Sequence, residues 1–186
     1  MNPEVRIEAF AIVSEDGMLT DAAGNIPPSL KLDADRHFFE SGLDAADIVV
    51  QGRNSQDQLT HSATRHRLIV TARVPSIAPD PANSRAILWN PVGASFDEAL
   101  SKFPSPNLSV AVIGGPRVFE LFLDRYDVFY LSRVAGVRLP GGLPIFGEPS
   151  RTPEAVLAEY GLDNPEHELV DADKGLTITG WRRSEI

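Results

Sequence analysis

The sequence contains no cysteine among its 186 residues. This absence excludes disulfide frameworks, thiolate nucleophiles and zinc sites built on cysteine. The four histidines are not spaced like metal ligands, so we expect no metal site. Long apolar runs are also missing, because none approaches the roughly 18 residues of a membrane span, and residues 1–6 lack the basic start and apolar stretch of a signal peptide. We therefore expect a soluble, cytoplasmic protein that binds no membrane.

Positive charge is scarce as well. Lysine and arginine together number 17 against 26 aspartates and glutamates, which gives a formal net charge of −9. This balance argues against a general nucleic-acid binder, which needs a basic face, but it is compatible with a local basic pocket for a phosphorylated small molecule. Hydrophobic residues make up 42% of the chain, enough for a core of normal size. The chain has neither internal repeats nor a clear interdomain linker, so we interpret residues 1–186 as one domain.

Short runs of β-branched residues alternate with helical patterns along the chain. Such short, continuous apolar runs are typical of strands covered on both faces, as in a parallel sheet. The expected strands span residues 5–13, 48–50, 68–70, 86–89, 110–113 and 128–131. The expected helices span residues 33–41, 96–103, 117–126 and 152–161.

Local signals set the ends of these helices. Asp33 can cap the first helix, which we expect to end at Gly42. Ser95 and Glu98 have the spacing of a capping box at the start of the second helix, and Pro116 suits the first position of the third. The alternation predicts an α/β doubly wound fold, with a mostly parallel central sheet and helices on both faces. Residues 168–170 and 176–181 flank a turn-rich stretch and predict an antiparallel hairpin at the edge of the sheet.

The strongest motif is the passage from the strand at 110–113 into the following helix. Gly114 and Gly115 lie between them, and glycines let a backbone approach a ligand closely. The start of the helix presents free N–H groups and the positive end of a dipole, which suit a phosphate, and Arg117 adds a positive charge. The alternative is an ordinary tight turn between a strand and a helix.

A second strand, at residues 48–50, also runs into a glycine and an arginine, Gly52 and Arg53. Ligands of open α/β sheets bind outside the carboxyl ends of the strands. The two strand ends are therefore candidates for one anion-binding edge. The alternative for Arg53 is a solvated surface charge.

The helix at residues 33–41 carries a third candidate. Asp35, Phe38 and Phe39 have the spacing of one helix face. A carboxyl beside two aromatic rings would be partly desolvated, which raises its pKa and suits a proton donor or an anchor for a ring edge. The alternative is that Asp35 only stabilises the start of the helix.

In this order, the segments resemble the dihydrofolate reductase superfamily, which includes the pyrimidine reductases of riboflavin synthesis. Residues 112–123, VIGGPRVFELFL, look like the family pattern V-I-G-G-x-x-V-[YF]-x-x-F-L. Residues 129–134 look like its Y-L-T-x-I strand, and residues 141–146 stand where the family has G-D-x-x-F-P. Residues 49–55 resemble V-x-M-G-R-x-T, and residues 11–19 resemble the A-x-S-x-D-G-x-I start of the pyrimidine reductases.

The resemblance implies an NADPH-dependent reductase that transfers hydride to a pterin- or pyrimidine-like heterocycle. It places Asp35 at the acid that anchors a pterin, as a catalytic and substrate-binding residue, and Phe39 at an aromatic substrate contact. It assigns cofactor binding to Ala11, Met18, Leu19, Gly52, Arg53, Asn54, Ser55, Thr71, Ala72, Ile113, Gly114, Gly115, Arg117 and Val118.

The chain also departs from the family pattern. Dihydrofolate reductases carry a W-x-L-P-x-[DE] segment, and no tryptophan precedes Asp35 here. Gly142 replaces the aspartate of the family turn, and Ala72 stands where a phosphate-binding serine is often found. The identity of the substrate therefore stays open, and the alternative is a non-catalytic ligand-binding or scaffold protein of the same fold. The sequence does not fix the oligomeric state, but base rates and the resemblance favour a homodimer.

Overall fold

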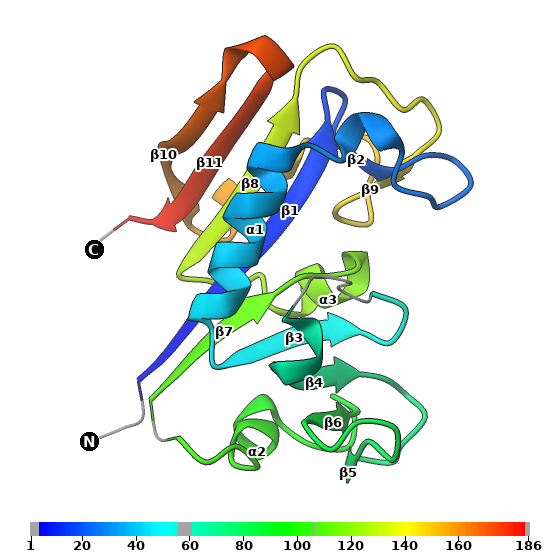
Figure 1. Ribbon diagram of the computed structural model, residues 1–186, viewed down its shortest axis with the longest axis vertical. Helices are drawn as coiled ribbons and strands as arrows, with labels where there is room; N and C mark the ends of the chain where they lie inside the picture. The colour runs from blue at the N-terminus through cyan, green and yellow to red at the C-terminus, as the bar shows by residue number, and fades with distance from the viewer. Residues whose placement is uncertain (1–3, 56–60, 106, 185–186) are drawn as a thin grey trace.

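The computed structural model describes residues 4–55, 61–105 and 107–184, and its centre is a nine-stranded sheet (Figure 1). The strand order is β10-β11-β8-β1-β7-β3-β4-β6-β5. The parallel strands are β1 (Val5–Ser14), β3 (Ile48–Gly52), β4 (His66–Val70), β6 (Ala86–Trp89), β7 (Leu108–Val112) and β8 (Val128–Val134). The antiparallel strands at the two edges are β5 (Ile77–Pro79), β10 (Leu162–Asp171) and β11 (Leu176–Arg183). A second, two-stranded sheet joins β2 (Met18–Thr20) to β9 (Leu143–Pro144).

Helices cover both faces of the central sheet. They are α1 (Asp33–Ala45), α2 (Phe96–Leu100), α3 (Pro116–Leu121) and α4 (Pro153–Glu159), with 3-10 turns η1 (Pro28–Leu30), η2 (Ser62–Thr64) and η3 (Ala172–Lys174). Figure 1 shows α1 lying across the sheet over β1 and β8. Its aromatic residues pack with Phe10 and Ala111, whereas the neighbouring residues Ala9 and Val112 belong to the core cluster that contains residues of α2, α3 and α4. The predicted α/β fold with a mostly parallel sheet is confirmed, as is the antiparallel hairpin at its edge. The assignment of residues 1–186 to one domain stays a prediction.

The first helix corrects two sequence predictions. Its cap residue is Leu32, and Asp33 is its first residue rather than its cap. The helix also continues through Gly42 to Ala45. A Cβ atom at Gly42 would lie 2.3 Å from Cζ of Phe10, so this glycine allows the helix to approach the sheet rather than ending the helix.

The next two helices are shorter than predicted. The capping box of Ser95 and Glu98 is present, but α2 ends at Leu100. The third helix ends at Leu121, because the following residues form tighter turns such as the bond from the N–H of Phe122 to the carbonyl of Phe119. These turns bury Tyr126, whose hydroxyl donates to the carbonyl of Phe119 at 3.0 Å.

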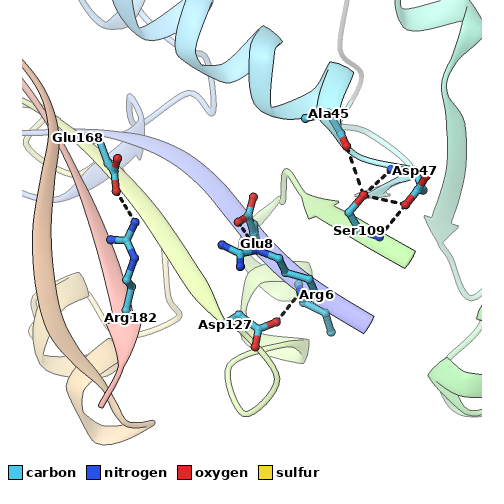
Figure 2. Close-up of polar contacts among 9 residues, drawn as sticks. Arg6, Glu8, Ala45, Asp47, Ser109, Asp127, Glu168 and Arg182 are labelled. Atoms are coloured by element: carbon cyan, nitrogen blue, oxygen red, sulfur yellow. Dashed lines mark hydrogen bonds and ion pairs between the residues drawn. The ribbon is translucent and has the colours of Figure 1, made fainter. Parts of the chain in front are cut away.

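Hydrogen bonds between two polar residues hold β3 and β7 together at the amino ends of these strands. Figure 2 shows Asp47, just before β3, beside Ser109 of β7. The Asp47 carboxylate accepts bonds of 2.8 Å from both the N–H and the hydroxyl of Ser109. The register that follows pairs Val50 with Val112, which brings Gly52 opposite Gly114 just beyond the end of β7.

Candidate active site

The carboxyl ends of β3 and β7 meet at their glycines. The N–H of Gly52 donates to the carbonyl of Gly114 at 2.7 Å, and the N–H of Ile113 donates to Val50 at 3.0 Å. The peptide bond between Gly114 and Gly115 is cis, and Gly114 has a φ of +92°. The structure thus brings together the two strand ends that the sequence suggested as one edge.

The glycines at this junction differ in what a side chain would meet. A Cβ atom at Gly114 would lie 2.5 Å from the ring of Phe119, and one at Gly52 would lie 3.7 Å from the nitrogen of Gly115. Among the residues that the structure describes, a Cβ atom at Gly115 would meet only Oγ of Ser55, at 3.6 Å. Gly115 and Ser55 therefore lie close to each other at the junction, and α3 begins directly after Gly115.

Positive charge surrounds this junction. Arg53 and Arg117 are exposed beside it, together with Asn54, and Val118 is buried in the first turn of α3. Arg73 is exposed just beyond β4, the neighbour of β3. Among the residues that the structure describes, no acidic side chain forms an ion pair with these three arginines. The basic groups are free to bind an anion.

The end of β4 carries one buried and one exposed residue of the predicted cofactor set. Thr71 is buried, its N–H donates to the carbonyl of Trp89 at 2.9 Å, and its hydroxyl oxygen accepts from the N–H of Arg73 at 3.2 Å. Ala72 is exposed beside it. Thr71 therefore joins β4 to β6 and shapes the loop that carries Arg73.

The strand β1 extends past β7 at this edge. Its residues from Val5 to Ala9 pair with β7, and its residues from Glu8 to Ser14 pair with β8. In the part of the chain that the structure describes, no strand pairs with the β7 side of β1 beyond Ala9. The backbone edge of β1 from Phe10 onward is thus open next to the glycine junction.

Asp35 lies on the other side of this open edge. It is half-buried on α1, and the buried Ser132 of β8 interacts with its carboxyl through the hydroxyl. Burial raises the pKa of Asp35, and the bond with Ser132 offsets part of that rise. The direction agrees with the sequence prediction. Ser132 itself carried no signal in the sequence, because a serine within a strand does not reveal which helix lies above it.

The other predicted residues divide between the two faces of the sheet. Phe39 and Ile113 are half-buried in the cluster of Phe10 on the α1 face, with the rings of Phe39 and Phe10 6.2 Å apart. Ala11 and Leu19 instead pack against the large core on the opposite face. The structure therefore places Ala11 and Leu19 on the opposite face of the sheet from Asp35. Met18 begins β2 and is half-buried.

Two hollows lie beside this region rather than within it. One of about 130 Å³ lies behind the turn at residues 15–17, next to Arg133 and residues 149–153. Another of about 230 Å³ lies between Trp89, Phe96 and Arg125. Over the described residues, no group of three or more His, Asp or Glu is arranged to hold a metal ion. No helix in these ranges is both long and apolar enough to cross a membrane.

The mostly parallel sheet with its antiparallel edge hairpin is an α/β fold like that of dihydrofolate reductases and pyrimidine reductases, and solved structures of both share it. A diaminohydroxyphosphoribosylaminopyrimidine deaminase/5-amino-6-(5-phosphoribosylamino)uracil reductase from Thermotoga maritima is 18% identical with a TM-score of 0.64, covering 98% of this chain and 57% of its own. A pyrimidine reductase-like protein from Corynebacterium diphtheriae is 16% identical with a TM-score of 0.63, covering 97% and 92%.

A dihydrofolate reductase from Enterococcus faecalis, complexed with NADP(H), is 16% identical with a TM-score of 0.60 and covers 97% of each chain. No family model matches the sequence, and no curated protein matches it. At these identities the comparison establishes the fold, and the resemblance expected from the sequence is confirmed at that level.

Proposed function

We propose that the protein is an NADPH-dependent reductase that transfers hydride to a pterin- or pyrimidine-like heterocycle. The observation that carries this proposal is the open edge of β1 beyond Ala9, which has the glycine junction on one side and the carboxyl of Asp35 on the other. Ligands of open α/β sheets bind at the carboxyl ends of strands, where the strand order reverses direction. Here the chain runs from β3 outward to β4 but from β7 in the opposite direction to β8, so the reversal lies between β3 and β7, at the glycine junction beside β1.

The glycine junction suits the phosphates of a dinucleotide. Gly115 has no side chain to keep a phosphate away from the backbone at the start of α3, and Arg53, Arg117 and Arg73 supply positive charge near it. This local charge fits a phosphorylated cofactor even though the whole chain is acidic. Asn54, Thr71, Ala72 and Val118 would complete the walls around the adenosine and phosphate groups.

The open edge of β1 suits the reacting rings. NADPH would supply the hydride, and the chain would supply position, exclusion of water and a proton. Ala11, Ile113, Met18 and Leu19 would border the nicotinamide. Asp35 would bind the amino or imino edge of the heterocycle beside Phe39, and its raised pKa keeps a protonated fraction at higher pH than an ordinary carboxyl would.

Binding and turnover test different parts of this proposal. NADPH is titrated while the fluorescence of Trp89 and Trp181 is followed, and oxidation of NADPH is then measured with dihydrofolate, dihydropteridines and the riboflavin-pathway aminouracil. We expect saturable NADPH binding and turnover of one of these rings. Binding without turnover on any of them would favour a non-catalytic protein of the same fold, and absence of binding would refute the proposal. The same samples, measured by analytical ultracentrifugation, test the homodimer that the sequence favours.

A further inference from the structure

The hollow of about 230 Å³ between the loop after β6 and the end of α3 has an aromatic floor. The floor consists of Trp89, Phe96 and Phe122, whose ring centroids lie between 4.9 and 6.2 Å from one another. Because these rings are almost fully buried and pack on each other, the floor is apolar and fixed. An apolar cavity of about 150 Å³ can hold a benzene molecule, so this hollow has room for one ring or one branched side chain.

The loop after β6 forms a preformed wall of the hollow. The indole N–H of Trp89 donates to the carbonyl of Ala94 at 2.9 Å, and the N–H of Ala94 donates to the carbonyl of Asn90 at 3.2 Å. A Cβ atom at Gly93 would lie 1.8 Å from the carbonyl oxygen of Pro75, so the loop packs closely against the chain before β5. A small molecule that enters the hollow would therefore pay little conformational entropy to order its wall.

Two opposite charges stand at the rim of the hollow. Asp124 and Arg125 both line it from the turns that follow α3, and both are exposed. The Cζ atom of Arg125 lies 5.6 Å from the centre of the Phe96 ring, which places the positive charge over the aromatic floor. In the ranges that the structure describes, neither side chain takes part in an ion pair. The rim therefore offers a guanidinium to an anionic group and a carboxylate to a cationic one.

We propose that this hollow binds a free apolar α-amino acid of about the size of leucine or phenylalanine. Its side chain would lie on the aromatic floor, its carboxylate would accept from Arg125, and its ammonium group would donate to Asp124. An acid or an amine alone would meet one like charge at the rim, so the two opposite charges favour a zwitterion. The site is separate from the glycine junction, because the junction lies at the start of α3 and the hollow at its end.

Calorimetric titration of the protein with L-phenylalanine tests this site. We expect saturable binding with a dissociation constant of about 1 mM or lower, as for other ligands of this size. Two analogues carry one charge each: 2-phenylethylamine lacks the carboxylate, and 3-phenylpropanoate lacks the ammonium group. Each should bind about fivefold to tenfold more weakly than L-phenylalanine, because each loses one partly exposed ion pair. Absence of saturable binding at about ten times the expected dissociation constant would overturn the proposal.

Substitutions at the rim assign the two charges. Arg125→Gln and Asp124→Asn are surface changes, and each should lower the affinity for L-phenylalanine about fivefold to tenfold. Arg125→Gln should also bind L-phenylalanine and 2-phenylethylamine equally, because the carboxylate then has no partner. Arg85→Gln is the matched control, since Arg85 is exposed before β6 and has no ion pair among the described residues. This control and Arg53→Ala at the junction should bind L-phenylalanine like the wild type.

Three other outcomes would contradict the proposal. Equal binding of 3-phenylpropanoate and L-phenylalanine would show that the hollow takes an aromatic acid instead. A loss of L-phenylalanine binding in Arg53→Ala as large as that in Arg125→Gln would place the amino acid at the glycine junction. Self-association that disappears in Leu121→Asp, without binding of L-phenylalanine, would assign the hollow to a second copy of the chain. None of these measurements uses NADPH, so their failure leaves the proposed reductase function standing.

Discussion

Replacing each glycine of the junction by alanine should give opposite results at Gly114 and Gly115. At Gly114 the φ of +92° disfavours any residue with a Cβ atom, at a cost on the order of 1–3 kcal/mol. The same Cβ atom would lie 2.5 Å from the ring of Phe119, which is buried, and such overpacking typically costs about 1–3 kcal/mol more. We therefore expect Gly114→Ala to lower the free energy of unfolding by about 2–6 kcal/mol.

Gly115→Ala should fold like the wild type. Its φ of −64° and ψ of −161° suit any L-residue, and among the described residues its Cβ atom would meet Ser55 alone, at an ordinary contact distance of 3.6 Å. The new methyl group would, however, stand where we expect a phosphate to approach the backbone. Losing charge-assisted bonds there should cost about 1.5–3 kcal/mol, or roughly tenfold to a hundredfold in affinity for NADPH.

Urea unfolding of both variants, together with NADPH titration of Gly115→Ala, tests this pair. The expected pattern is a strongly destabilised Gly114→Ala and a stable Gly115→Ala that binds NADPH weakly. If Gly115→Ala binds NADPH within twofold of the wild type, the junction has only a structural role. If Gly114→Ala is as stable as the wild type, the steric argument from Phe119 is wrong.

Three further changes test other parts of the molecule. Arg53→Ala should lower the affinity for NADPH about tenfold to a hundredfold and leave that for NADH nearly unchanged, because an arginine can bind a 2′-phosphate bidentately; equal affinities of the wild type for both cofactors would contradict this. Asp35→Asn should lower kcat about a hundredfold while leaving NADPH affinity intact, and turnover within twofold of the wild type would make Asp35 a helix-start charge only. The pKa of Asp35 is raised in the fold, so the contribution of its protonated form to the free energy of unfolding is complete below the ordinary carboxyl pKa. This contribution is lost as the pH rises through the raised value. The Asp35→Asn variant, which does not titrate, should therefore become more stable relative to the wild type as the pH rises. Gly42→Ala should destabilise the protein by about 1–3 kcal/mol despite the higher helix propensity of alanine, as urea unfolding would measure, because its Cβ atom would meet Phe10 at 2.3 Å.

The sequence predicted most of what depends on local pattern. Continuous β-branched runs such as residues 48–50 became strands buried on both faces, and the spacing of Ser95 and Glu98 became a capping box. It did not predict β2, β5 or β9, because strands of two or three residues are too short to show a period, and prolines at 79 and 144 argue against strands.

The errors at Gly42 and at the end of α3 have a common cause. Each depends on a contact with residues distant in sequence or on how the chain must turn to enter the next strand. A glycine near the end of a helical pattern indicates a cap when only its neighbours are known. The side chain of Phe10, which requires the glycine, belongs to another element and becomes relevant only once α1 lies on β1.

The candidate site shows the same division between local pattern and distant contact. A general rule for parallel sheets was enough to place Gly52 near Gly114, because the carboxyl ends of neighbouring parallel strands share one edge. No such rule pairs Asp35 with Ser132, or Asp16 with the N–H of Leu139, since those contacts depend on the angle of α1 and on the path of the chain after β8.

The unpaired length of β1 depends on register in the same way, because β7 turns away at Gly114 while β8 continues along β1 as far as Ser14. Lengthening the β7 ladder by even two residues would cover the edge of β1 that the proposed rings need, so the glycine junction has a second consequence: it ends β7 early enough to leave that edge open.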